Sequence, residues 1–124
     1  MILVEAKAHF GELSSSCGAG AKSLAVIRGS LDRTKHEFGA PAEADWLNGF
    51  YQYANRLAHL AFLRSHGVDA HLVFLYFYGD HDMKGPGSAA EWKAALPKVY
   101  QHLGISGDLA KSGVVNVFLP VAGL

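Results

Sequence analysis

The stretch that most constrains the fold is a run of seven apolar residues from Leu72 to Tyr78. All of them are aliphatic or aromatic, which is typical of a β-strand whose two faces are both covered by other parts of a protein. We therefore predict a strand over residues 69–78 that is covered on both faces. Because a membrane-spanning helix needs about twenty apolar residues, the length of this run also predicts a soluble protein.

Hydrophobic periodicity and capping signals predict five further elements along the chain. Asp45 is a candidate N-cap for the longest helix, and Ser88 with Glu91 forms a capping box for another. The predicted strands are 2–8 and 114–121, and the predicted helices are 23–36, about 46–66 and about 88–103. Strands that are separated by helices require crossover connections and at least one parallel pair. We predict an α/β fold with a small mixed sheet flanked by helices, in the order strand, helix, helix, strand, helix, strand.

The charge and cysteine content set limits on the class of protein. The 124 residues include 11 lysines and arginines and 11 aspartates and glutamates. This balance excludes a polybasic tail and an acidic disordered region, while a local basic site stays compatible with it. Cys17 is the single cysteine, so no disulfide can form within the chain. A chain without disulfides suits a reducing compartment, and we expect a cytoplasmic protein of one domain, residues 1–124.

Two charged residues occupy one face of the predicted first strand. Successive side chains of a strand point to opposite faces, so Glu5 and Lys7 lie on the same side. One interpretation is a solvated strand face that carries a weak ion pair. A strand that is otherwise apolar rarely places an acid and an amine side by side, so a functional pair is the alternative interpretation.

The segment Glu5-Ala6-Lys7 resembles the third motif of the PD-(D/E)xK nuclease superfamily, whose members include restriction enzymes and junction resolvases. The helical stretch 51–56 looks like the glutamine motif that several branches of that superfamily carry on a helix facing the catalytic strand. The resemblance covers the topology of about residues 2–78. It implies a restriction-endonuclease-like fold and the Mg²⁺- or Mn²⁺-dependent hydrolysis of nucleic-acid phosphodiester bonds, with DNA as the expected partner.

The same resemblance implies roles for individual residues. Glu5 and the backbone carbonyl of Ala6 would be ligands of the metal ion, and Lys7 would lie beside the metal-bound water. Gln52 would orient the site or the substrate backbone, and Arg56 would contact a phosphate. The remaining candidates are Asn55 next to Arg56, Lys22 in a loop rich in serine and glycine, and Glu12 and His9 beside the site.

The chain departs from the superfamily pattern ahead of Glu5. Members carry a metal-binding aspartate on a hairpin before this strand, whereas only Met1 to Val4 precede Glu5 here. Three hypotheses follow: the sequence lacks its N-terminal hairpin, the domain has lost catalysis, or Asp80 or Asp82 replaces the missing acid. A missing hairpin would leave the edge of the first strand unpaired, so we expect a homodimer that hides this edge.

Two rival hypotheses are also compatible with the sequence. The first is a catalytically inactive domain on the same fold that forms oligomers or binds a partner. The second is an unrelated α/β domain in which Glu5 and Lys7 form a surface ion pair. The position of Gln52 distinguishes this second hypothesis, because an unrelated fold would place Gln52 far from Lys7.

Overall fold

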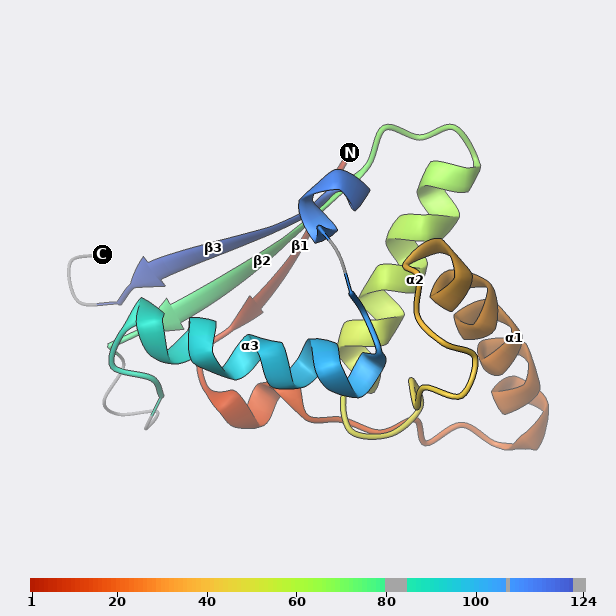
Figure 1. Ribbon diagram of the computed structural model, residues 1–124, viewed down its shortest axis with the longest axis horizontal. Helices are drawn as coiled ribbons and strands as arrows, with labels where there is room; N and C mark the ends of the chain where they lie inside the picture. Colours follow the sequence, from red (N-terminus) through yellow and green to blue (C-terminus); the bar gives the residue numbers. More distant parts are fainter. Residues whose placement is uncertain (80–84, 107, 122–124) are drawn as a thin grey trace.

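The computed structural model describes residues 1–79, 85–106 and 108–121 as a mixed α/β fold with a three-stranded sheet and three α-helices (Figure 1). Two short 3-10 helices, η1 and η2, add to the predicted order of elements. The elements in chain order are β1 (Ile2–Lys7), η1 (Phe10–Leu13), α1 (Ala21–Glu37), α2 (Tyr51–Ser65), β2 (His71–Tyr78), α3 (Ala89–Leu103), η2 (Leu109–Ser112) and β3 (Val114–Pro120). None of these helices combines the length and the apolar composition that crossing a membrane requires.

The sheet has the order β1-β2-β3, and both pairs of strands are parallel. The prediction of a mixed sheet is therefore wrong for the described residues. The physical reason is that helices lie in both connections between consecutive strands. The chain therefore returns to the same end of the sheet before the next strand begins. The apolar β2 is the central strand, as its composition favours, and the charged β1 is an edge strand.

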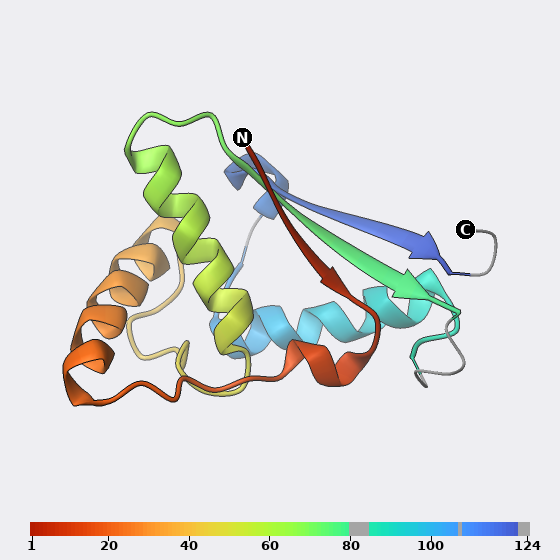
Figure 2. The same ribbon diagram turned by 180° about the vertical axis from the view of Figure 1, so that it is seen from behind.

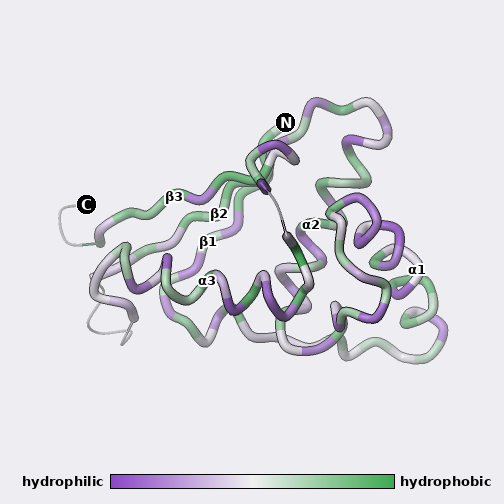
Figure 3. The backbone as a smooth tube through the Cα atoms, viewed as in Figure 1, coloured by the Kyte–Doolittle hydropathy of each residue, from purple (hydrophilic) through white to green (hydrophobic). Residues whose placement is uncertain are grey.

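The helices gather on one face of the sheet, and α1 packs on the outer side of α2 (Figures 1 and 2). Leu72, Phe74 and Tyr76 of β2 point toward the helices and are fully buried, while the alternate residues of β2 are only partly buried. The prediction that β2 is covered on both faces is therefore wrong among the described residues. The backbone tube shows hydrophobic residues in each of the three strands (Figure 3).

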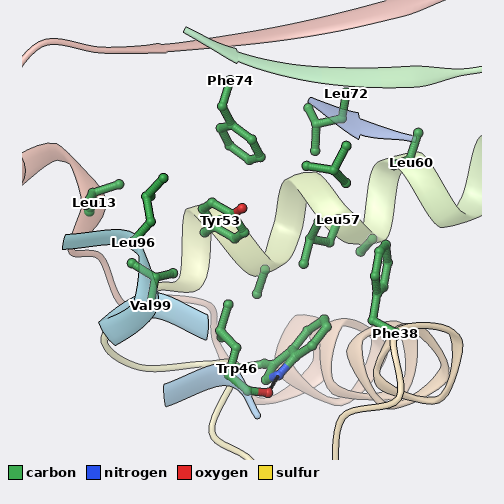
Figure 4. Close-up of a cluster of buried hydrophobic side chains, with 14 of the residues drawn as sticks. Leu13, Phe38, Trp46, Tyr53, Leu57, Leu60, Leu72, Phe74, Leu96 and Val99 are labelled. Carbon is green, nitrogen blue, oxygen red and sulfur yellow. Dashed lines mark hydrogen bonds between the residues drawn. The ribbon is translucent and has the colours of Figure 1, made fainter. Parts of the chain in front are cut away.

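The core lies between β2, α2 and α3 and is rich in aromatic rings. The ring of Tyr53 stacks on that of Phe74 with 4.4 Å between their centroids, and Leu57 and Leu60 continue this contact along α2 (Figure 4). Trp46 is buried and its Nε1–H donates to the Leu103 carbonyl over 2.8 Å. The first set of contacts packs α2 against the sheet, and the hydrogen bond of Trp46 joins the loop before α2 to the end of α3.

The start of α2 differs from the prediction. Asp45 does not cap this helix, because its carboxylate accepts hydrogen bonds from the N–H groups of Leu47 and Asn48, 3.0 Å each, within a local turn. The helix begins only at Tyr51. In contrast, the capping box of Ser88 and Glu91 is present at the start of α3, as predicted.

Candidate functional site

Glu5 and Lys7 lie on the face of β1 that is turned toward the helices. Side chains on this strand alternate between more exposed and less exposed positions, and Lys7, only 5% exposed, is the most buried of them. Lys7 Nζ lies 3.1 Å from Glu5 Oε1, so the two groups form an ion pair. The prediction of a shared face is confirmed, and the interpretation as a solvated surface pair does not agree with the burial of Lys7.

The first turns of α2 bring two more polar side chains to this pair. Gln52 Oε1 accepts a hydrogen bond from Lys7 Nζ over 3.2 Å. Arg56 lies four residues further along α2, on the same side of the helix, and its Nε donates to Glu5 Oε2 over 2.8 Å. Gln52, Lys7, Glu5 and Arg56 therefore form one continuous chain of contacts, which we call the β1–α2 cluster.

The electrostatics of the β1–α2 cluster favour an ionised Glu5. Partial burial acts to raise the pKa of Glu5, but the hydrogen bonds and charges of Arg56 and Lys7 outweigh it and hold the pKa below its ordinary value of 4.5. With Glu5 ionised, two cationic groups face one carboxylate. The cluster therefore has a formal surplus of one positive charge, which suits an anionic ligand.

This shift predicts how stability depends on pH. Because the pKa of Glu5 is lower in the folded state, its ionised form stabilises the protein above its ordinary pKa, and the effect is lost as the pH falls through the folded-state value. We expect the difference in unfolding free energy between the wild type and Glu5→Gln to be largest near pH 7 and to shrink below about pH 4. Urea unfolding at both pH values measures it, with the exposed Glu43→Gln as control. If the difference in unfolding free energy does not depend on pH, the pKa of Glu5 is not lowered in the folded state.

The loop before α1 positions the start of α2. Ser15 Oγ accepts the backbone N–H of Gln52 over 2.7 Å, and the Ser15 carbonyl accepts from the N–H of Tyr51 over 3.2 Å. Glu12 Oε1 accepts the N–H of Ala8 over 2.9 Å, directly after Lys7. The role of Ser15 was not predicted from the sequence. Residues 14–16 are all serine, which is typical of caps and turns, but nothing local indicates which helix they contact.

The other predicted site residues lie at varying distances from the β1–α2 cluster. Asn55 is partly buried on α2 beside Arg56. Lys22 is exposed in the first turn of α1, a helix that packs on α2 rather than on the sheet (Figure 2). Its predicted place at the site is therefore not supported, because the loop leads away from β1. Asp80 and Asp82 lie outside the described residues.

Two groups at the β1–α2 cluster, the Glu5 carboxylate and the Ala6 carbonyl, have oxygen atoms of the kind that Mg²⁺ binds. Each oxygen of Glu5 has one cationic partner, which leaves further lone pairs on both. The Met1 carbonyl accepts a hydrogen bond from His71 at the start of β2. Successive residues of a parallel strand direct their backbone groups to opposite sides, so the Ala6 carbonyl points away from β2, to the outer edge of β1. Mg²⁺ keeps several waters and needs only one or two carboxylates besides substrate phosphates. Within residues 1–79, 85–106 and 108–121, no three His, Cys, Asp or Glu side chains gather around a common point.

Comparisons with known proteins provide no relative for this arrangement. No family model matches the chain, no curated protein matches it, and no solved structure matches it. The β1–α2 cluster itself consists of an acid, two cations and an amide that meet at the β1 edge of a parallel sheet.

Proposed function

We propose that this chain is a nuclease-like domain of the PD-(D/E)xK type, whose site for metal-dependent hydrolysis of nucleic-acid phosphodiester bonds is formed by Glu5, Lys7 and Gln52. The contact of 3.2 Å between Lys7 Nζ and Gln52 Oε1 carries this proposal. It joins an E-x-K strand to a glutamine-bearing helix that lies 45 residues further along the chain. The unrelated-fold hypothesis expected these two residues to lie far apart.

The β1–α2 cluster offers groups that suit each part of phosphodiester hydrolysis. In this reaction a water oxygen bonds to phosphorus, one P–O ester bond breaks, and the leaving oxygen takes up a proton. Lys7 provides an ammonium group that is fixed by Glu5 and Gln52, and a fixed cation stabilises the negative charge that builds on the phosphoryl oxygens. When Mg²⁺ is held by Glu5 and the Ala6 carbonyl, it supplies polarisation of the phosphate and activation of water.

Arg56 would bind and orient the substrate. Its side chain is about one third exposed, and one N–H of its guanidinium donates to Glu5. Because a guanidinium carries five donors in a planar fork, the outward donors remain suited to a phosphate oxygen of the nucleic-acid backbone. Asn55, beside it on α2, is the next polar group that a bound strand would meet.

The experiment that tests this proposal is a cleavage assay with purified domain, supercoiled plasmid and single-stranded DNA, in Mn²⁺ or Mg²⁺ and in EDTA. We expect cleavage that requires the divalent ion and that Glu5→Gln abolishes. Glu43→Gln, on an exposed loop, serves as the matched control and should cleave like the wild type. If the wild type shows no cleavage that depends on the divalent ion, the proposal that this chain is catalytic is wrong.

A second candidate is a catalytically inactive domain on the same fold that binds a partner or forms oligomers. The observation that favours it is the acid content of the site: Glu5 is the one carboxylate in contact with Lys7 or Arg56 among the described residues. The two candidates differ in a single measurement, since an inactive domain would bind nucleic acid or a protein without cleaving DNA in Mn²⁺.

A further inference from the structure

The face of the sheet that points away from the helices is largely apolar, and no other described element covers it. It consists of the residues of each strand that alternate with the buried ones, and the strand register aligns them in rows across the sheet. The two central rows, which we call the open face, are Val4–Val73–Val115 and Ala6–Leu75–Val117. Phe77 extends the open face along β2 at one end, and the row of the exposed Ile2 and His71 adjoins it at the other end.

Exposure of the open face is unusual for a sheet of this kind. Parallel sheets almost always have both faces covered, because their strands are apolar throughout. Here Val4 is 58% exposed and Val115 is 42% exposed, and Ile2 beside them reaches 66%. No described helix packs on this side, which Figures 1 and 2 show from opposite directions. The hydrophobic effect therefore favours a partner that removes these side chains from water.

We propose that a second copy of this chain covers the open face, so that two sheets pack against each other through these rows. The six residues of the open face carry no charge and no side-chain hydrogen-bonding group, so an occupant has to be apolar as well. A surface that is uniformly apolar is complementary to itself, which is the requirement of a two-fold interface. Sheets that pack face to face do so about 10 Å apart with interdigitated side chains.

The size of the open face agrees with a dimer rather than with a small ligand. With Phe77 and Ile2 included, two such faces bury on the order of 1,000 Å² in total, which is the lower limit for a specific interface between proteins. Glu5 and Lys7 point to the opposite face of β1, toward the helices, so this dimer leaves the surroundings of both β1–α2 clusters unchanged. The inference is thus independent of the proposed catalytic activity.

The test is the molar mass in solution of the full chain, measured by light scattering after size exclusion at micromolar concentrations. We expect the wild type at twice 13.3 kDa and Val115→Lys at the monomer mass. The matched control is Val26→Lys, because Val26 is a valine on α1 that is 73% exposed and lies away from the sheet. This variant should remain a dimer. Circular dichroism verifies the fold, and Val4→Lys takes the place of Val115→Lys if the latter does not fold.

Three results would overturn the inference. One is a wild type that stays monomeric across the micromolar range. Another is a dimer that persists in Val115→Lys or in Val4→Lys, because its contact would then lie elsewhere. Pairing through the free edge of β1 is distinguished by Val4→Pro, which removes an outward N–H of that edge and keeps the open face apolar. We expect Val4→Pro to remain a dimer. A monomeric Val4→Pro would show that the dimer forms by pairing of the β1 edges rather than by packing of the open faces.

Discussion

Replacing Lys7 by methionine is expected to lower Mn²⁺-dependent cleavage of DNA by about 100-fold or more, because the site loses a fixed cation beside the reacting phosphate. Methionine fills a similar volume in the buried position that Lys7 occupies. Glu5 keeps its ion pair with Arg56, so its charge is not left without a partner. The fold should therefore persist while activity is lost, which steady-state cleavage rates and thermal unfolding measure together.

The chain offers a matched control for this substitution. Lys35 on α1 is 7% exposed, pairs with Asp32 over 3.3 Å and donates to the Ala42 carbonyl over 3.0 Å. It resembles Lys7 in burial and pairing but lies on α1, which packs mainly on α2. Lys35→Met should lose stability and retain cleavage. If both variants lose cleavage in proportion to their stability, Lys7 has a structural role and the assignment of the site is wrong.

Truncating Trp92 to alanine is expected to lower the unfolding free energy by about 3–5 kcal/mol, the usual range for a large aromatic residue in a core. Trp92 is fully buried on α3, its ring lies 4.9 Å from that of Tyr76, and its Nε1–H donates to the Phe77 carbonyl over 2.8 Å. The substitution removes the packing and also leaves a backbone carbonyl of β2 without this donor.

Urea unfolding of Trp92→Ala and Trp92→Phe separates these two contributions. Phenylalanine retains much of the ring packing but cannot donate a hydrogen bond, so its loss should be the smaller of the two. Lys93→Ala, at the exposed neighbouring position of α3, is the control and should change stability by less than about 1 kcal/mol. A loss below about 1 kcal/mol for Trp92→Ala would show that α3 does not pack on the sheet in this way.

Sequence patterns predict those elements whose signals are local. The strand β2 follows from a run of apolar residues, and the start of α3 follows from a capping box in which Ser88 and Glu91 contact each other's backbone. The start of α2 does not follow in this way. Asp45 has the composition of a helix cap but closes a separate turn, while Ser15, 37 residues before Gln52 in the chain, accepts the backbone N–H of Gln52 in the first turn of α2. A cap that comes from a distant loop leaves no local signal.

The candidate site shows the same division between local and distant information. That Glu5 and Lys7 share a face follows from the alternation of a strand, and the contact of Gln52 with Lys7 was expected from a resemblance rather than from the pattern alone. The pairing of Arg56 with Glu5 was not predicted, because it depends on how α2 crosses β1 in three dimensions. The uncovered sheet face was not predicted either, since an apolar run does not reveal which neighbours cover it.

The two surfaces of the sheet have separate chemistry. The side that faces the helices carries the β1–α2 cluster at the edge of β1, where charged groups approach each other within about 3 Å. The opposite side carries the open face, without a charged group in its two rows. This separation allows the proposed catalytic role and the proposed dimer to be tested by different substitutions that do not share a residue.

The most direct test of the central claim is an NMR titration of the isotopically labelled domain with a short single-stranded oligodeoxynucleotide in the absence of divalent ions. The signals to follow are the side-chain amide of Gln52, the Nε–H of Arg56 and the backbone amides of residues 5–7. If the β1–α2 cluster binds the phosphodiester backbone, these signals shift together and more than those of α1 or the open face. Unchanged signals from these groups while other parts of the domain respond to the DNA would contradict the account.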